Sequence, residues 1–164
     1  QYDPGMHALL VPFPMAPVNT KNVHRTNFLL GHPYGTDFAY DEMMVAPGAG
    51  EIARVATETL ATAFSLLGTG GLKPGAGPTR EERAKGFYDI LFVGELPDGG
   101  RVEAVVTGDR DPGYGSTSKM IAESALCLVR DVQGDGGIWT PGALMGPALR
   151  KRLEERAGLT FSAH

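Results

Sequence analysis

Hydrophobic residues recur with two different periods along this chain, and the shorter period predicts the strands. Residues 87–95 and 101–108 are apolar runs on either side of a Leu-Pro-Asp-Gly-Gly turn, a pattern typical of a hairpin of two antiparallel strands. Shorter strands are expected at 7–13, 38–45 and 159–161. The second of these lacks a clean alternation, so a helix there stays open.

The longer period, with apolar residues three and four positions apart, predicts the helices. Asn19 or Thr20 is the expected N-cap of the first helix, and Gly31 and Gly158 are expected to end the first and the last. With tight turns between strands, these elements predict an α+β fold, a largely antiparallel sheet with helices packed on it. The expected helices cover residues 21–30, 51–67, 117–129 and 143–157, with a short polar helical turn at 79–83.

The stretch 108–119, Gly-Asp-Arg-Asp-Pro-Gly-Tyr-Gly-Ser-Thr-Ser-Lys, joins the second hairpin strand to the third helix. Its glycines and proline predict a tight turn, and the three hydroxyls at 116–118 are expected to cap the helix. Three roles stay open for this junction. The first is structural, a turn and a helix cap alone. The second is an anion site that uses backbone N–H groups and Lys119, and the third is a catalytic edge where Tyr114 donates a proton.

The helix that follows this junction is apolar nearly all round. Between residues 119 and 130 its polar members are Lys119, Glu123, Ser124 and Arg130. A helix of this kind is buried on most sides, whereas a helix of a small domain usually buries one face. The pattern therefore predicts a second packing partner, either another domain or another subunit.

Composition narrows the class of protein without choosing a function. The 164 residues fit one domain, and with a net charge of −4 and no basic run among aromatics, no nucleic acid partner is expected. The four histidines have no companions at metal-ligand spacing, so no metal site is expected. The single cysteine, Cys127, is expected to be a buried thiol, with the reducing cytoplasm as the natural setting. No apolar run has the length of a membrane span.

Five stretches together resemble one known family. The first two are Pro-Phe-Pro-Met-Ala-Pro-Val-Asn-Thr-Lys-Asn-Val-His-Arg-Thr-Asn (12–27) and Tyr-Gly-Thr-Asp-Phe-Ala-Tyr-Asp-Glu (34–42). The other three are residues 108–128, Gly-Gly-Ile-Trp-Thr-Pro-Gly-Ala-Leu-Met-Gly-Pro-Ala-Leu (136–149) and Ala-Gly-Leu-Thr-Phe (157–161). In this order they resemble the C-terminal portion of the saccharopine dehydrogenase-like oxidoreductases, in the branch that includes trans-acting enoyl reductases. The similarity covers nearly the whole chain.

The resemblance implies a two-domain enzyme, with an N-terminal Rossmann domain for NAD or NADP and a C-terminal α+β domain for substrate and dimer contacts. No strand followed by Gly-x-Gly-x-x-Gly and a helix occurs in the chain, and the glycine-rich residues 68–78 lack that spacing. We therefore expect residues 1–164 to be one C-terminal substrate and dimerisation domain that binds no cofactor itself and is inactive alone. Its expected partners are the absent nucleotide-binding domain, a second copy as homodimer, and a small-molecule or lipid-like substrate.

Candidate site residues follow from polar chemistry and from position in this interpretation. Tyr114 and Lys119 are the candidate catalytic residues, at the edge where hydride transfer is expected. Solvent exposure alone also explains the three candidates on the first helix. A non-enzymatic dimerisation or binding module on the same fold stays open as a second function. The candidate substrate-binding residues are His24, Arg25, Asn27, Arg110 and Thr117.

Overall fold

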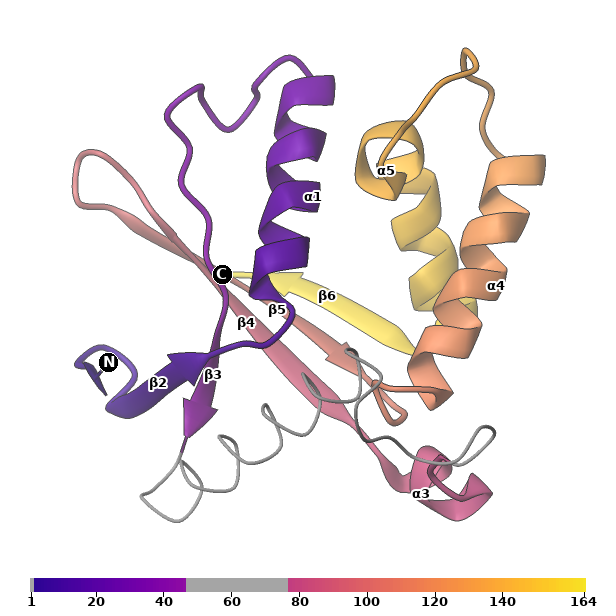
Figure 1. The fold of residues 1–164 in the computed structure, drawn as a ribbon, viewed down its shortest axis with the longest axis horizontal. Helices are drawn as coiled ribbons and strands as arrows, with labels where there is room; N and C mark the ends of the chain where they lie inside the picture. The colour runs from indigo at the N-terminus through magenta and orange to yellow at the C-terminus, as the bar shows by residue number, and fades with distance from the viewer. Residues whose placement is uncertain (1, 47–76) are drawn as a thin grey trace, which may run out of the picture. The chain divides into compact units, whose positions relative to one another are not determined.

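The computed structural model describes residues 2–46 and 77–164, and the chain divides into two compact units, Gln1–Ala76 and Gly77–His164 (Figure 1). Every strand pairing in the described part is antiparallel, which confirms the predicted α+β class. Within the same ranges, no helix combines the length and the apolar character that crossing a membrane requires.

Two sequence predictions lie outside the described residues. These are the helix at 51–67 and most of the glycine-rich connection at 68–78. That the whole chain forms one domain stays a prediction.

The first unit holds a three-stranded antiparallel sheet and a helix, α1 (Ala16–Leu29). Its strands are β1 (Tyr2–Asp3), β2 (Ala8–Pro12) and β3 (Met43–Ala46), with β2 in the centre. The central strand confirms the strand predicted at 7–13.

The strand predicted at 38–45 is shorter than expected, since only Met43–Ala46 pairs with β2. Phe38 and Tyr40 lie before it, in a stretch without strand structure. Their rings stack with centroids 6.3 Å apart, and the Tyr40 hydroxyl donates to Glu42 Oε1 at 3.0 Å. These local side-chain contacts take the place of strand pairing over the first half of the predicted element.

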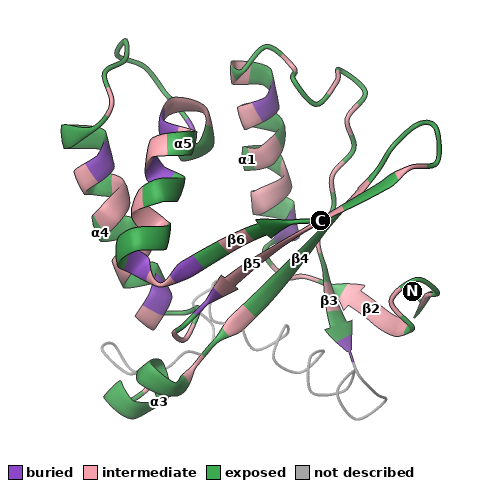
Figure 2. Cartoon of the chain, turned by 180° about the vertical axis from the view of Figure 1, so that it is seen from behind, coloured by how far each residue is buried: buried purple, intermediate pink, exposed green. Residues whose placement is uncertain are grey.

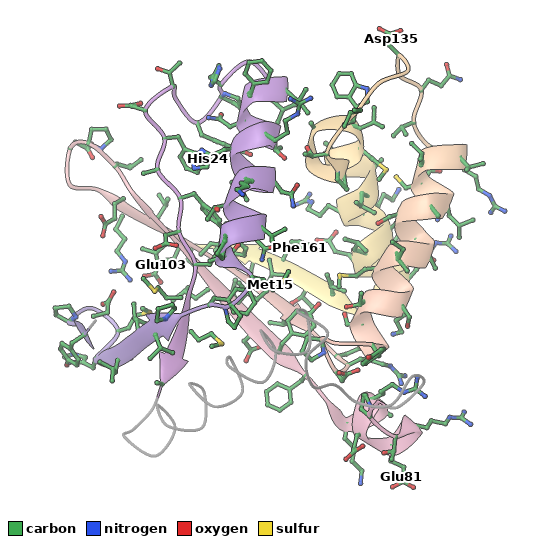
Figure 3. All side chains as sticks on the ribbon, viewed as in Figure 1. Met15, His24, Glu81, Glu103, Asp135 and Phe161 are labelled. Atoms are coloured by element: carbon green, nitrogen blue, oxygen red, sulfur yellow. The ribbon has the colours of Figure 1, made fainter. Side chains whose placement is uncertain are left out.

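Helix α1 begins at residue 16 rather than at 21, so the predicted N-cap at Asn19 or Thr20 is wrong. Met15 holds the N-cap position, directly before the helix (Figure 3). Pro17 lies in the first turn, where its missing N–H costs no helical hydrogen bond. A proline that looked like part of a turn is therefore part of the helix start.

In the second unit, β4 (Tyr88–Glu95), β5 (Arg101–Gly108) and β6 (Leu159–Ala163) form a sheet in that order. The first two confirm the predicted hairpin, with residue 95 opposite residue 101. Gly99 adopts φ +84° in the connection, the left-handed conformation that an Asp-Gly step favours.

Helices of the second unit confirm most of the predicted boundaries. Thr79 caps the short polar helix through a capping box with Glu82. Gly158 (φ +76°) is left-handed and ends its helical segment, as predicted, and Gly31 (φ +79°) does the same after α1 in the first unit. The elements are α3 (Arg80–Lys85), α4 (Gly115–Arg130), α5 (Pro141–Arg152) and a π-helical turn, η1 (Leu153–Ala157), that continues α5.

The core of the second unit lies between α4 and α5, and Figure 2 shows buried positions on both of these helices. Arg152 joins the two helices, because it donates to Glu123 at 2.7 Å and also bonds Asp131, just beyond α4. Cys127 is fully buried, as predicted, and burial raises the pKa of its thiol. The core residues are Cys127, Met145 and Leu149, with Val132, Leu144, Ala148 and Leu153 packed against them.

Candidate functional site

The junction between β5 and α4 is organised by one carboxylate. Asp111 accepts hydrogen bonds from the backbone N–H groups of Gly113, Tyr114 and Gly115, at 2.5 to 3.1 Å. The prediction that hydroxyls cap α4 is wrong, since Tyr114 is the N-cap residue and makes no side-chain cap bond. The hydroxyl of Thr117 instead donates to the carbonyl of Pro112.

This arrangement contradicts an anion site made of free N–H groups. The loop already holds an anion, because its N–H groups surround the Asp111 carboxylate, and the bond from Gly115 is the first cause of a pKa below the usual value of that carboxyl. Lys119 is likewise engaged: its Nζ lies 3.5 Å from Asp109 Oδ1 and donates to the carbonyl of Ala157 at 3.4 Å.

Three glycines let the chain approach closely around this junction. At Gly108 a Cβ would lie 2.2 Å from the ring of Tyr88, which crosses there to place its hydroxyl 2.9 Å from Ser116 Oγ on α4. At Gly86 a Cβ would lie 2.5 Å from the backbone of Asp111. The third is Gly158, where a Cβ would meet the carboxylate of Asp109. The junction therefore keeps this shape only with glycine, which has no side chain, at these three positions.

Two candidate residues of the junction retain unused polar groups. Tyr114 is 55% exposed, and the edge of its ring faces Gly77. The Nε of Arg110 is buried and has no hydrogen-bond partner among the described residues. A buried donor without a partner is rare in folded proteins and calls for an explanation.

The three candidates on α1 differ from one another. Asn27 is buried, donates to the carbonyl of Gly35 at 2.8 Å and accepts from the N–H of Tyr34 at 3.0 Å, so its amide fixes the loop after α1. His24 is exposed and projects from α1, with its ring edge-to-face on Phe38 (Figure 3).

Arg25, beside His24, is also exposed and lies 5.9 Å from the ring centre of Phe28. Tyr40 lies close to the same helix, and its pKa is raised to about 12. Burial is the larger cause, and the hydrogen bond to Glu42 is the next. The structure therefore places the candidates in two groups, one on α1 and one around the start of α4.

Helix α4 is not buried nearly all round, which corrects the expectation from its composition. Ile121, Leu128 and Val129 are 69%, 51% and 80% exposed, and Ala125 lies between them on the same face. Their spacing of three and four residues makes one apolar row along the helix. A second packing partner for this row stays a prediction.

Asp111→Asn is expected to lower stability near neutral pH and to have a smaller effect in acid. The N–H bonds hold the folded-state pKa of Asp111 below its ordinary value of 3.8, so its contribution is complete above 3.8 and is lost as the pH falls through the folded-state pKa. Urea denaturation from about pH 7 to about pH 3 measures this. Asp135→Asn, in the exposed α4–α5 connection, is the control. A loss of equal size at both ends of the range would contradict the argument.

Sequence reasoning missed the two residues that shape the junction. Asp111 lies four positions before Gly115, and Asp-Pro-Gly is a turn signal that points to an Asx-type role. The hydrogen bond between Tyr88 and Ser116 joins residues 28 positions apart, so no local sequence pattern indicates it. Within the described ranges, no group of three His, Cys, Asp or Glu side chains is arranged to hold a metal ion.

Neither a family model nor a solved structure matches the chain. It is 38% identical over 160 aligned residues to a Mycobacterium tuberculosis (strain H37Rv) protein provisionally named trans-acting enoyl reductase, covering 86% of this chain and 38% of that protein. Trans-acting enoyl reductases of Mycobacterium bovis BCG and Mycobacterium ulcerans are each 32% identical, over 86% and 92% of the chain. The chain spans about 40% of the length of these relatives, so the similarity is to one segment of the trans-acting enoyl reductases.

Proposed function

We propose that this chain is the C-terminal, substrate-binding part of an NAD(P)-dependent enoyl reductase of the saccharopine dehydrogenase-like kind. The observation that carries the proposal is 38% identity over 86% of the chain to a protein of which the chain spans 38%. The remaining length of such relatives leaves room for a Rossmann domain. That domain is needed because the present sequence contains no dinucleotide-binding fingerprint.

The apolar row of α4 supports a second domain as its partner. Ile121, Leu128 and Val129 repeat at the spacing with which helices pack on one another, and they are exposed. We assign this row to contact with the nucleotide-binding domain, since the relatives are more than twice as long as the aligned segment. The exposed phenol of Tyr114 lies at the N-cap of the same helix, so we expect this contact to bring the two parts of the site together.

Reduction of an enoyl group adds a hydride to one carbon and a proton to its neighbour, and the nicotinamide supplies the hydride. No residue of this chain is assigned to the nucleotide. Tyr114 offers a hydroxyl to donate the proton or to orient the substrate carbonyl. Arg110, whose Nε is buried without a hydrogen-bond partner among the described residues, stays a candidate for substrate contact. Lys119, held by Asp109, contributes a fixed positive charge. His24, Arg25 and Thr117 stay candidates for substrate contact.

Tyr114→Phe in the full-length protein is expected to lower kcat at least about 100-fold with little change in KM, because a general acid acts in the transition state. The assay follows NADPH or NADH oxidation with a 2-enoyl thioester. Tyr34→Phe is the matched control, since Tyr34 is 54% exposed and lies in the other unit.

Unchanged turnover of Tyr114→Phe would remove Tyr114 from the mechanism. A full-length protein that binds neither nucleotide would instead favour the non-enzymatic binding module. Asn27 is left out of this test, because its amide already holds the loop at Tyr34 and Gly35.

A further inference from the structure

The first turns of α4 are held to the rest of their unit at two points on one side of the helix. Ser116, which is fully buried, is hydrogen-bonded to the hydroxyl of Tyr88 at 2.9 Å. Lys119 reaches the carbonyl of Ala157 at 3.4 Å. Residues three positions apart lie on the same face of a helix, so the two contacts together fix the rotation of α4 about its axis.

Lys119 connects segments that end or begin at the same place. Its Nζ lies 3.5 Å from Oδ1 of Asp109, directly after β5, and it donates to the carbonyl of Ala157, the last residue of η1. Residue 108, at the end of β5, pairs with residue 159, at the start of β6, so these segments meet beside the start of α4 (Figure 1). One ammonium group therefore joins the helix to the end of a strand and to the end of a helical turn.

Asp109 is itself held in place by Gly158. The N–H of Asp109 donates to the carbonyl of Gly158 at 3.3 Å. A Cβ at residue 158 would lie 2.3 Å from Oδ1 of Asp109, so the carboxylate lies directly against the glycine. The left-handed φ of +76° at the same residue also favours glycine. The carboxylate that receives Lys119 therefore has a fixed place.

Tyr114 lies on a different side of α4 from these contacts. It is five positions before Lys119, which corresponds to a rotation of about 140° around a helix with 3.6 residues per turn. Burial agrees with this, since Tyr114 is 55% exposed whereas Ser116 is fully buried. Lys119 therefore directs its charge toward the end of β5 and η1, away from the exposed phenol.

We propose that Lys119 is a positioning residue. Through Asp109 and the carbonyl of Ala157 it fixes the rotation of the start of α4, and with it the place of the Tyr114 phenol, without contacting the substrate. This rests on the proposed function, in which Tyr114 acts on the enoyl group. The ion pair is partly exposed, so water screens it and its contribution to stability is small. Its effect on the rate is larger, because a displacement of about 1 Å at a reacting group costs up to about 100-fold.

The test compares variants of the full-length protein by NADPH or NADH oxidation with a 2-enoyl thioester. Lys119→Met removes the charge at nearly constant length and is expected to lower kcat about tenfold, with KM changed less than about twofold. Lys119→Arg can still reach both acceptors and is expected to keep at least about half of the kcat. Lys151→Met is the matched control, since Lys151 is 75% exposed and pairs with Glu155 on the surface.

A double-mutant cycle separates positioning from catalysis. Asp109→Asn alone is expected to lower kcat at least about threefold, and to add less than about twofold to the loss in Lys119→Met, because both changes break one contact. A lysine that touches the substrate would behave differently. Its loss would far exceed that of Asp109→Asn, the two losses would multiply, and arginine would not restore a proton transfer. That pattern would overturn the inference, as would an unchanged kcat in Lys119→Met.

Hydrogen exchange in the 164-residue chain gives a readout that does not require turnover. The amides of Gly115, Ser116 and Ser118 are bonded to Asp111 or Tyr114, and Lys119→Met is expected to raise their exchange rates at least about threefold, with residues 124–130 unchanged. Unchanged exchange at the start of α4 would also overturn the inference. If the unmodified full-length protein reduces no enoyl thioester, the proposed function fails, and the exchange result alone decides whether Lys119 positions the helix.

Discussion

Gly108→Ala is expected to lower the free energy of unfolding by about 3 kcal/mol. A Cβ at this position would lie 2.2 Å from the ring of Tyr88, and the ring cannot move aside without losing its bond to Ser116. Urea denaturation, followed by the fluorescence of Trp139, the single tryptophan, measures the change.

The matched control for Gly108→Ala is Gly94→Ala in the neighbouring strand. There a Cβ would meet only the tip of Val102, which can change rotamer, so the expected loss is below about 1 kcal/mol. Combining Gly108→Ala with Tyr88→Leu is expected to recover part of the loss, because the two changes act on one contact. Equal losses at the two glycines would contradict the role assigned to Tyr88.

Gly86→Ala is expected to affect both stability and the site. A Cβ would lie 2.5 to 2.6 Å from the N, Cα and Cβ atoms of Asp111, so the loop itself must shift. The backbone at Gly86 (φ −65°, ψ 154°) suits alanine, and the cost of about 2 kcal/mol comes from the clash rather than from strain. Since Asp111 holds the N–H of Tyr114, the shift also moves the candidate acid.

In the full-length protein, if it has the proposed reductase activity, Gly86→Ala is therefore expected to lower kcat together with stability. Gly136→Ala is the control, since a Cβ there would meet nothing within 4 Å. Urea denaturation and turnover are measured on the same preparations. A destabilised Gly86→Ala variant with full turnover would show that the position of Tyr114 does not matter for the reaction.

Local signals explain which elements the sequence predicted correctly. The hairpin of β4 and β5 follows from two apolar runs around a Pro-Asp-Gly-Gly turn, and each part of that signal lies within a few residues. The two left-handed glycines that end helical segments, Gly31 and Gly158, were predicted for the same reason. The start of α1 was missed because Pro17 fits a turn and a first helical turn equally well in sequence.

The candidate site was harder to predict because its organising contacts are not local. Tyr88 reaches Ser116 from 28 positions away, and Lys119 reaches the carbonyl of Ala157 from 38. For α4 the sequence predicted a helix that is apolar all round, and Val129 is nonetheless 80% exposed. Composition indicates what a side chain prefers, but its burial depends on a surface that has to be supplied by another part of a protein.

The length of the π-helical turn η1 determines which side chains of the following strand, β6, face the core. A π turn contains more residues than an α turn, so it shifts the rest of the chain along by about one position. Leu159 lies opposite Gly108 and is buried, and Phe161 follows on the same face of β6. Side chains alternate along a strand, so shortening η1 by one residue would turn Thr160 toward that face in their place. The length of a single helical turn thus decides which half of β6 is core and which half is surface.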